Sequence, residues 1–324
     1  MSIIVQKYGG TSVATKEKLE NICSRIISYI NKKNKLVIVV SAQGKTTDKL
    51  NSLSLEYSDN PNKEDLDLLL SIGEVQTVAL LSMMLKDKGI KVATLTGGQI
   101  GIVSDSNFGN AKIENIYTDN IIQNLNNDTV VIIPGFQAIN KFGEITTLGR
   151  GGSDLTAVAL ACSLKANRCE IYTDVDGVLT SNPKVVHKTK LLKNISYDEM
   201  LQAASSGAKV LHDRCVSLAK KYDLNINVKN SDNNSKGSVV SNITMESSKI
   251  SILSNIDNLS KISIVGNMLL SNNEILVKIF SILAKENIKL ENISFSETCI
   301  SLIISNSNME NLINILHNEL ITNS

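Results

Sequence analysis

Short apolar runs alternate with helical patterns along the first 230 residues. The apolar runs are rich in β-branched residues, and they predict strands at 36–40, 92–95, 129–133 and 169–173. An amphipathic stretch precedes or follows each of them. This alternation is typical of a parallel sheet covered by helices, so we expect an α/β fold with a mainly parallel sheet sandwiched by helices.

A helical stripe runs through residues 65–85 and is interrupted at Gly73. Its apolar members are Leu66, Leu69, Leu70, Val78, Leu81 and Leu85. The spacing predicts a helix with one buried face, and we assign the stripe to the core, apart from Glu74.

A polar, turn-rich stretch at 230–242 interrupts the pattern and predicts a domain boundary. We therefore expect one domain at 1–232, a linker at 233–248 and a second domain at 249–324. In the second domain, strands are expected at 249–253, 261–265, 288–294 and 298–304, with helices at 273–286 and 309–320. The order β-βαββα is sufficient for one small α+β, ferredoxin-like unit.

Composition describes an ordinary soluble globular chain. Of 324 residues, 42% are apolar and 20% are charged, and the net charge is +1. This charge and the lack of a basic run argue against nucleic-acid binding. The five cysteines show no metal-ligand spacing, so we expect them to be reduced and mostly buried. No apolar run approaches the ~20 residues of a membrane span, and the chain begins directly with a strand, so we expect a cytoplasmic protein.

The segment 147–154, TLGRGGSD, is the most informative part of the chain. Its glycines allow the backbone to approach phosphate oxygens, and the apolar run 155–164 predicts a helix whose positive end faces the turn. Arg150 is suited to binding a carboxylate with two parallel hydrogen bonds. Asp154 is the acid of the turn, placed to serve a metal or phosphate-binding lysines, or simply to interact with the helix dipole.

A second glycine turn follows the first strand. Lys7 stands at the carboxyl end of that strand, directly before Gly9 and Gly10. A point charge there suits a transferring phosphoryl group, although the P-loop order GxxxxGK[ST] is absent. The alternative is a surface lysine at a strand end.

These turns belong to a longer series of motifs. In order, the series reads KYGGTS, SAQGKTTD from Ser41, GE at 73–74, FGNAK, PGF, TTLGRGGSD, TDVDGV from Thr173, and GAKVL at 207–211. It resembles the aspartate kinases of the amino-acid kinase family. The resemblance implies transfer of the γ-phosphate of MgATP to the side-chain carboxylate of L-aspartate, which gives 4-phospho-L-aspartate for lysine, threonine and methionine synthesis.

The resemblance also implies roles for single residues. Lys7 and Asp154 would be catalytic, and Glu74 would receive the α-ammonium group of the substrate. The carboxylate side of the substrate would be bound by Ser41, Thr47, Arg150 and Ser153. Two alternatives remain, because Thr46 and Thr47 also suit a helix cap and Glu74 also suits a charged helix face.

ATP is implied at Lys7, Gly9, Gly10, Thr173, Asp174, Leu179, Lys184 and Lys209. Leu179 stands where the family usually has an aromatic residue, Asn182 where it has an aspartate, and Lys184 where it has an arginine. The affinity for the nucleotide is therefore less defined by the sequence than the phosphoryl-transfer chemistry. No metal ligand and no catalytic histidine is assigned. The substrate carboxylate, with a pKa near ~3.9, is already ionised and needs no general base.

The C-terminal region resembles an ACT domain, with ISFSETCIS at 293–301 similar to the family's ISxSExxIS. Aspartate kinases usually carry two such units, one inserted in the other, and here we expect the inserted one to be missing. We therefore expect one unit, with 249–253 as its displaced strand, weak or no inhibition by lysine or threonine, and a homodimer formed through the edge near 261–265.

Two other functions are possible. A catalytically weak regulatory protein would act through its ACT unit, and another kinase of the same fold would act on glutamate, acetylglutamate or UMP. Retention of Lys7, Glu74, Arg150 and Asp154 argues against the first. The complete set of substrate-side residues argues against the second.

Overall fold

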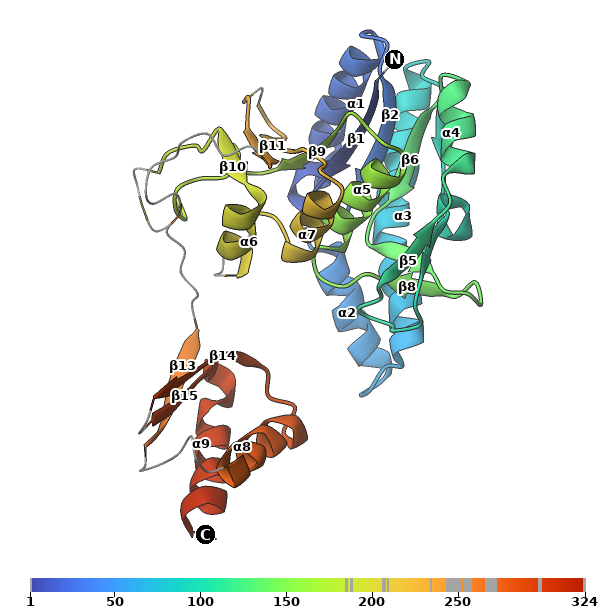
Figure 1. Cartoon of the computed structure of the whole chain (residues 1–324). Helices are drawn as coiled ribbons and strands as arrows, with labels where there is room; N and C mark the ends of the chain where they lie inside the picture. Colours follow the sequence, from blue (N-terminus) through green and yellow to red (C-terminus); the bar gives the residue numbers. More distant parts are fainter. Residues whose placement is uncertain are drawn as a thin grey trace. The chain divides into compact units, whose positions relative to one another are not determined.

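The computed structural model describes residues 2–183, 186, 189–205, 208, 210–233, 235–242, 252, 258–265, 273–296 and 299–322. The chain divides into two compact units, Met1–Ser254 and Asn255–Ser324. Figure 1 shows their elements.

The first unit is built on one large sheet, and its fold class is the predicted one. Across the described part of the chain, eight strands follow the order β10 (Asn194–Ser196), β12 (Ser238–Ser241), β11 (Ile226–Asn230), β9 (Arg168–Thr173), β1 (Ile3–Tyr8), β2 (Lys35–Val40), β6 (Val130–Pro134) and β3 (Val92–Thr94). All neighbours from β11 to β3 are parallel, while β12 is antiparallel to β11. The predicted runs at 36–40, 92–95, 129–133 and 169–173 fall on four of these strands.

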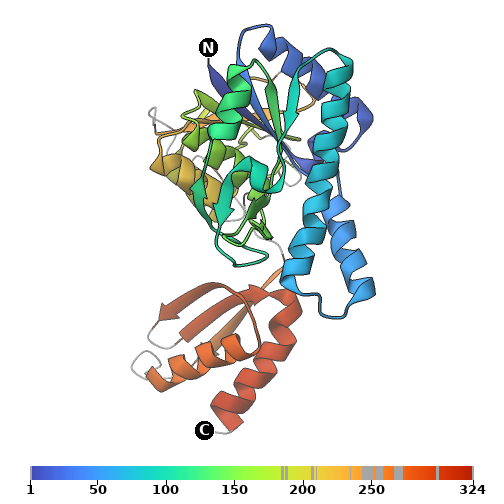
Figure 2. The same ribbon diagram turned by 90° about the vertical axis from the view of Figure 1, so that its right-hand side faces the viewer.

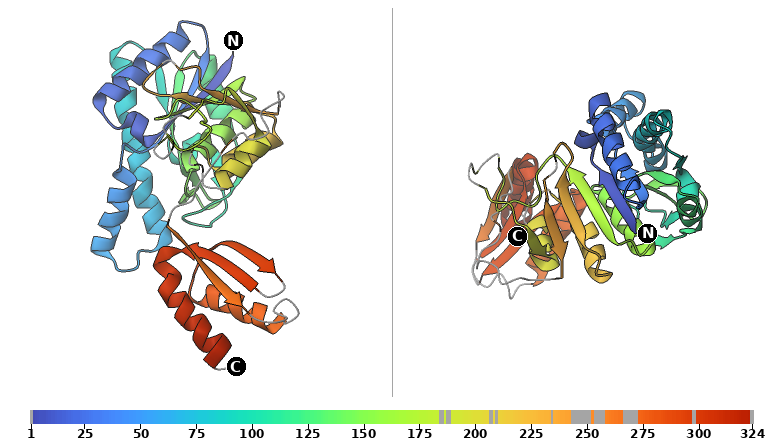
Figure 3. Two further views of the ribbon diagram at one scale, coloured as in Figure 1. Left: turned by 90° about the vertical axis from the view of Figure 1, so that its left-hand side faces the viewer. Right: turned by 90° about the horizontal axis from the view of Figure 1, so that it is seen from above.

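Helices cover both faces of the sheet (Figures 2 and 3). Successive strand residues point to opposite faces, so Ile4 and Ile38 pack with α1 (Lys16–Ile30) and α3 (Lys63–Asp87). Val5 joins the other core. The helices of that second core are α4 (Asp119–Asn126), α5 (Gly152–Ser163), α6 (Tyr197–Ser205) and α7 (Asp213–Lys221).

A smaller sheet lies within the same unit and was not predicted. It contains β5 (Ile113–Ile116), β4 (Ile102–Ser104), β7 (Gln137–Ile139) and β8 (Ile145–Thr147), in that order. Strands of three or four residues carry too few alternating positions to give a clear pattern. The last of them, β8, leads directly into the turn that contains Arg150.

The helix α3 is continuous through Gly73, where an interruption was expected. A Cβ atom at Gly73 would lie 2.8 Å from the Cβ atom of Ala42, so the glycine permits close packing and does not break the helix. By length and composition alone, α3 is also long and apolar enough to cross a membrane, which the sequence analysis did not anticipate. Val78, Leu81 and Leu85 are buried in the core beneath the large sheet, as expected for a core helix.

The polar stretch at 230–242 needs a correction. β12 occupies Ser238–Ser241 and pairs with β11, so this part of the expected linker belongs to the sheet of the first unit. The stretch before it is the hairpin connection between the two strands. Turn-forming residues mark hairpins and linkers alike, and the sequence alone did not separate them.

The second unit contains an antiparallel sheet and two helices. Within the described ranges, its strands follow the order β13 (Leu259–Val265), β15 (Cys299–Ser305), β14 (Leu290–Ser296), and its helices are α8 (Asn273–Lys285) and α9 (Met309–His317). Its core is formed by Ile262, Ile279, Leu283, Ile288, Ile300, Leu302, Ile304, Leu312 and Leu316. The observed order βαββα agrees with the prediction for 258–320. The strand expected at 249–253 lies outside the described residues, except for Ile252, which lies in no strand and packs against the core of the first unit, not against the second unit as expected.

All five cysteines are free. Cys23, Cys169 and Cys215 are buried, and Cys162 and Cys299 are partly buried. Burial raises the pKa of Cys23 and Cys162 to about 11, so these two thiols remain protonated at neutral pH.

Candidate functional site

Lys7 and Asp154 form an ion pair at the end of the central strand. Lys7 lies two residues after Val5 on β1, so its side chain points to the same face, toward α5. Its Nζ atom lies 2.6 Å from Oδ1 of Asp154, and the two side chains are 11% and 14% exposed. A cation is therefore held at the carboxyl end of β1, with its charge balanced by the first turn of α5.

Glycines shape the approach to α5. Gly149 and Gly151 have φ values of +76° and +73°, a region that residues with a Cβ atom rarely adopt. A Cβ atom at Gly151 would also lie 2.6 Å from the Cβ atom of His212. α5 begins at Gly152, three residues earlier than expected, so Ser153 and Asp154 lie in its first turn. The backbone N–H of Gly152 donates to the carbonyl oxygen of Gly149 at 2.9 Å. The first turn of a helix leaves further N–H groups without an intrahelical partner, and such a helix end suits an anionic ligand.

Glu74 projects from α3 into the same region. Its Oε1 atom accepts a hydrogen bond of 3.1 Å from the backbone N–H of Ala42, a contact that the missing Cβ of Gly73 permits. Its Oε2 atom is buried and has no hydrogen-bond partner within the described residues. Burial raises the pKa of Glu74 to about 7. A buried, unpartnered carboxylate oxygen of this kind suits a ligand that brings a positive charge.

Most of the predicted residues line one pocket of about 310 Å³. Its lining includes the predicted residues Lys7, Gly10, Ser41, Thr47, Glu74, Arg150, Ser153 and Asp154. Thr47 is not a helix cap, because α2 (Thr46–Tyr57) begins at Thr46 with Lys45 in the capping position. Arg150 is exposed and forms no ion pair in the described part of the chain. The pocket thus combines two cations, a helix end and a buried carboxylate.

Other predicted residues lie outside this lining. The backbone N–H of Gly9 donates to the carbonyl oxygen of Tyr172 at 3.2 Å, which joins the first turn to the end of β9. Thr173 follows there, and its hydroxyl donates to Asp174 at 3.1 Å. Leu179 forms an isolated bridge with Leu191. Lys184 and Lys209 lie outside the described residues.

Phe136 and Gly44 are among the lining residues that were not assigned from the sequence. Phe136 lines the pocket with a φ of +70°, and Gly44 lines it with a φ of +54°. Before Phe136, a Cβ atom at Gly135 would lie 2.7 Å from Ser153. The signal was the Pro-Gly-Phe sequence at the end of a buried strand, since a glycine there indicates close approach of the backbone.

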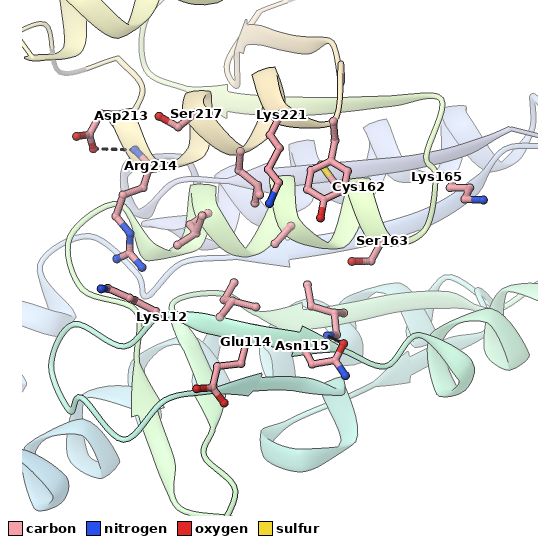
Figure 4. Close-up of a pocket in the computed structure, with 16 residues that line it drawn as sticks. Lys112, Glu114, Asn115, Cys162, Ser163, Lys165, Asp213, Arg214, Ser217 and Lys221 are labelled. Atoms are coloured by element: carbon pink, nitrogen blue, oxygen red, sulfur yellow. Dashed lines mark hydrogen bonds between the residues drawn. The ribbon is translucent and has the colours of Figure 1, made fainter.

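A larger groove of about 880 Å³ lies elsewhere in the first unit, between α5, α7 and β5 (Figure 4). None of the predicted site residues lines it. Four of the side chains drawn there are basic: Lys112, Lys165, Arg214 and Lys221. The candidate catalytic and substrate-binding residues therefore lie together in the smaller pocket.

Comparison with known families identifies the family of each part of the chain. Residues 2–230 match the amino acid kinase family, and residues 255–318 match the ACT domain. The chain is 50% identical over 240 residues to an aspartokinase of Geobacillus stearothermophilus, covering 74% of this chain and 59% of that protein. It is 43% identical over 291 residues to aspartokinase 2 of Bacillus subtilis, covering 90% and 71%.

Among solved structures, aspartokinase III of E. coli in complex with aspartate and ADP resembles the chain with a TM-score of 0.77. The identity is 27%, and the match covers 94% of this chain and 78% of that one. The chain spans about three fifths of the length of the Geobacillus protein. From the family match and the relatives together, this chain belongs to the aspartokinases of the amino acid kinase family.

Proposed function

We propose that the chain is an aspartate kinase, which transfers the γ-phosphoryl group of ATP to the side-chain carboxylate of L-aspartate. The observation that carries the proposal is the composition of the 310 Å³ pocket. The pocket is lined by the Glu74 carboxylate, which can accept from an ammonium group, by the Arg150 guanidinium, and by Lys7 beside the N-terminal end of α5. That is the set of groups an amino acid and a polyphosphate require when they react with each other.

Glu74 is proposed to bind the α-ammonium group of aspartate. Its unpartnered Oε2 atom is buried, so a cation brought by the substrate would satisfy an oxygen that otherwise lacks a partner. Arg150, with Ser41, Thr47 and Ser153 as hydroxyl donors, is proposed to bind the carboxylate side of the substrate. All five residues line the pocket.

Lys7 is proposed to stabilise the transferring phosphoryl group. A side-chain oxygen of aspartate attacks the γ-phosphorus, the bond to the β–γ bridging oxygen breaks, and ADP leaves with the electron pair. No proton moves, because the attacking carboxylate is already ionised. The work of these residues is therefore alignment and charge neutralisation, by Lys7 and by the N-terminal end of α5, while Asp154 holds Lys7 in place.

The nucleotide is proposed to be ATP, bound near Gly9, Gly10, Thr173, Asp174 and Leu179, with Lys184 and Lys209 in the family's positions. Mg²⁺ is proposed to enter with the nucleotide. The described residues contain no cluster of three acidic, histidine or cysteine ligands, and an ion held largely by substrate phosphates and one or two carboxylates fits that donor set. Mg²⁺ would then neutralise phosphate charge during transfer.

The biological setting is also a proposal. We propose a cytoplasmic enzyme that forms 4-phospho-L-aspartate for lysine, threonine and methionine synthesis. We further propose a homodimer formed through the ACT domain, where β13 is an edge strand of the described sheet and Val265 is 75% exposed.

The test is phosphoryl transfer from MgATP, trapped with hydroxylamine, over a panel of aspartate, glutamate, acetylglutamate and UMP. Aspartate alone should give a hydroxamate. Product from another acceptor, or no product from folded protein that still binds ATP, would contradict the proposal, and the second result would favour a regulatory protein.

A further inference from the structure

A buried carboxylate outside the pocket holds the strand end that leads to Arg150. Asp67 lies on α3, seven residues before Glu74, and its side chain is 1% exposed. Its Oδ1 atom accepts from the hydroxyl of Thr147 at 2.6 Å. Its Oδ2 atom accepts from the backbone N–H groups of Thr147 at 2.7 Å and Gly109 at 2.9 Å. One carboxylate thus binds two segments that are far apart in the sequence.

A guanidinium binds the same two segments through other atoms. Arg214, in the first turn of α7, donates through its two terminal nitrogens to the carbonyl oxygens of Leu148 and Ala111 and to Oδ1 of Asn110. The distances to Ala111 and Asn110 are 2.9 and 3.1 Å. Figure 4 shows the Arg214 side chain extending from α7 toward the segment that bears Lys112.

The two segments, residues 109–111 and 147–148, are also joined directly, and we call them the paired loops. The backbone N–H of Ala111 donates to the carbonyl oxygen of Thr147 at 2.8 Å. A Cβ atom at Gly149 would lie 2.7 Å from Oδ1 of Asn110 and 3.2 Å from the carbonyl oxygen of Gly109, so the paired loops pack closely against this glycine. The paired loops are therefore fixed by a carboxylate from α3, a guanidinium from α7 and their own backbone.

Arg150 lies two residues after Leu148, the last residue of the paired loops. Between Leu148 and α5, the turn contains two glycines with positive φ, and the Arg150 side chain has no ion pair in the part of the chain that the structure describes. Glycines impose little conformational restraint. The place of Arg150 in the pocket therefore depends on where Leu148 is held on one side and where α5 begins on the other.

We propose that Asp67 and Arg214 are positioning residues for aspartate, which set the turn at 149–151 and, through it, the guanidinium of Arg150. The proposal rests on the proposed function, because it assigns Arg150 to the amino-acid substrate. Neither residue lines the 310 Å³ pocket, and we assign neither a contact with the substrate. Their effect is on geometry, and a displacement of the order of 1 Å is sufficient to weaken a bidentate contact.

Two conservative variants test this proposal. Asp67→Asn keeps the size of the side chain but removes the negative charge that accepts from the two backbone N–H groups, and it replaces one carboxylate oxygen with an amide donor. Arg214→Lys keeps the charge but replaces a planar fork that reaches three acceptors with a single ammonium group. Each variant is expected to raise the KM for aspartate about tenfold and to leave kcat and the KM for ATP within about twofold.

Matched controls separate positioning from general loss of stability. Asp65→Asn alters an exposed acid on α3, and Lys221→Met alters an exposed base on α7. Both controls should leave the KM for aspartate unchanged. A comparable rise in both Michaelis constants for Asp67→Asn and Arg214→Lys would show a general structural role and would overturn the proposal.

A double-variant cycle gives a second readout. If Asp67 acts through Arg150, Asp67→Asn should raise the KM for aspartate less than about twofold once Arg150→Ala is present, because the effects of coupled residues do not add. A full tenfold rise in that background would contradict the proposal. Arg214→Lys in the same background provides the equivalent test if Asp67→Asn does not fold.

The failure of this proposal differs from the failure of the proposed function. If the wild type phosphorylates another acceptor of the panel, the aspartate assignment fails, and the same pair of Michaelis constants is measured with that acceptor. If the wild type phosphorylates aspartate and both variants keep its KM, only the positioning roles fail. If the wild type has no turnover, the affinity for aspartate is measured by calorimetry instead of the KM. An unchanged affinity in both variants would then refute the positioning roles.

Discussion

Lys7 Nζ lies 2.6 Å from Oδ1 of Asp154, and this contact joins the carboxyl end of β1 to the first turn of α5. The position follows from the alternation of the strand, which directs Lys7 to the α5 face together with Val5. Because both side chains are largely buried, the pair fixes the Lys7 ammonium group beside a helix end, where phosphate oxygens are favoured.

Replacement of Lys7 by alanine should reduce turnover by about 10²–10³-fold, because a cation that strengthens its hold in the transition state is lost. The aspartate affinity should be mostly unchanged, since the proposed substrate contacts come from other residues. Steady-state kinetics and calorimetry measure the two effects. Lys32→Ala, at an exposed lysine, is the control. Unchanged turnover in Lys7→Ala would refute the assigned role.

The same variant should unfold more easily, because Asp154 is left as a nearly buried charge without its partner. Removing one member of a buried pair costs roughly 3 kcal/mol. The double variant Lys7→Ala/Asp154→Asn should recover part of this stability and none of the activity. Denaturant unfolding gives the free energies, and recovery of turnover in the double variant would contradict the account.

Glu74 should make aspartate binding depend on pH. Burial raises the pKa of this carboxyl to about 7, and a ligand ammonium group favours the ionised form. Aspartate affinity should therefore fall as the pH drops through 7, by roughly tenfold between pH 8 and pH 6. Calorimetry with Glu74→Gln should show weaker binding without this pH dependence, whereas the exposed control Glu64→Gln should behave as the wild type. A persistent pH dependence in Glu74→Gln would point to another group.

The same raised pKa predicts a stability effect of defined sign. The folded state holds this proton more tightly than the unfolded state, so the contribution of Glu74 to stability is lost as the pH rises from about 4.5 through 7. Glu74→Gln should thus be more stable than the wild type at pH 8, by up to about 3 kcal/mol, and similar to it at pH 4. Denaturant midpoints at the two pH values measure the difference. Equal stabilities at pH 8 would contradict the raised pKa.

The sequence predicts the long strands better than it predicts the short strands and the surroundings of the site. The long strands of the large sheet have apolar side chains on both faces, and this gave a clear signal at 36–40 and 169–173. The three-residue strands β4, β7 and β8 gave none. Asp67 was also missed, because an acid within an apolar helix reads as a surface position until the three N–H and O–H groups that it accepts from are known.

Gly73 is a second residue whose role the sequence alone did not reveal. The sequence predicts an interruption of the helix at this glycine, whereas in the fold the glycine permits the contact between α3 and Ala42. Gly73→Ala should separate these segments, because the new Cβ atom would lie 2.8 Å from that of Ala42. We expect a loss of about 1–3 kcal/mol in stability and a higher KM for aspartate. A variant with wild-type stability and KM would show that the packing there is looser than described.

Lysine and threonine should have little effect on the rate, within about twofold at millimolar concentration. The reason is the single ACT unit expected from the sequence, and an ACT match spans residues 255–318. Initial rates with each amino acid added separately measure this. Strong inhibition would show that a single unit, paired with a second copy, forms an effector pocket, and the mass of the protein in solution would then be that of a dimer.

The most direct test of the central claim is the rate of aspartyl hydroxamate formation from aspartate and MgATP, compared between the wild type and Lys7→Ala. We predict aspartate-dependent product from the wild type and a loss of about two or more orders of magnitude in the variant, with both proteins folded and binding aspartate equally. Equal rates in the two proteins, or no aspartate-dependent product from the wild type, would contradict the account.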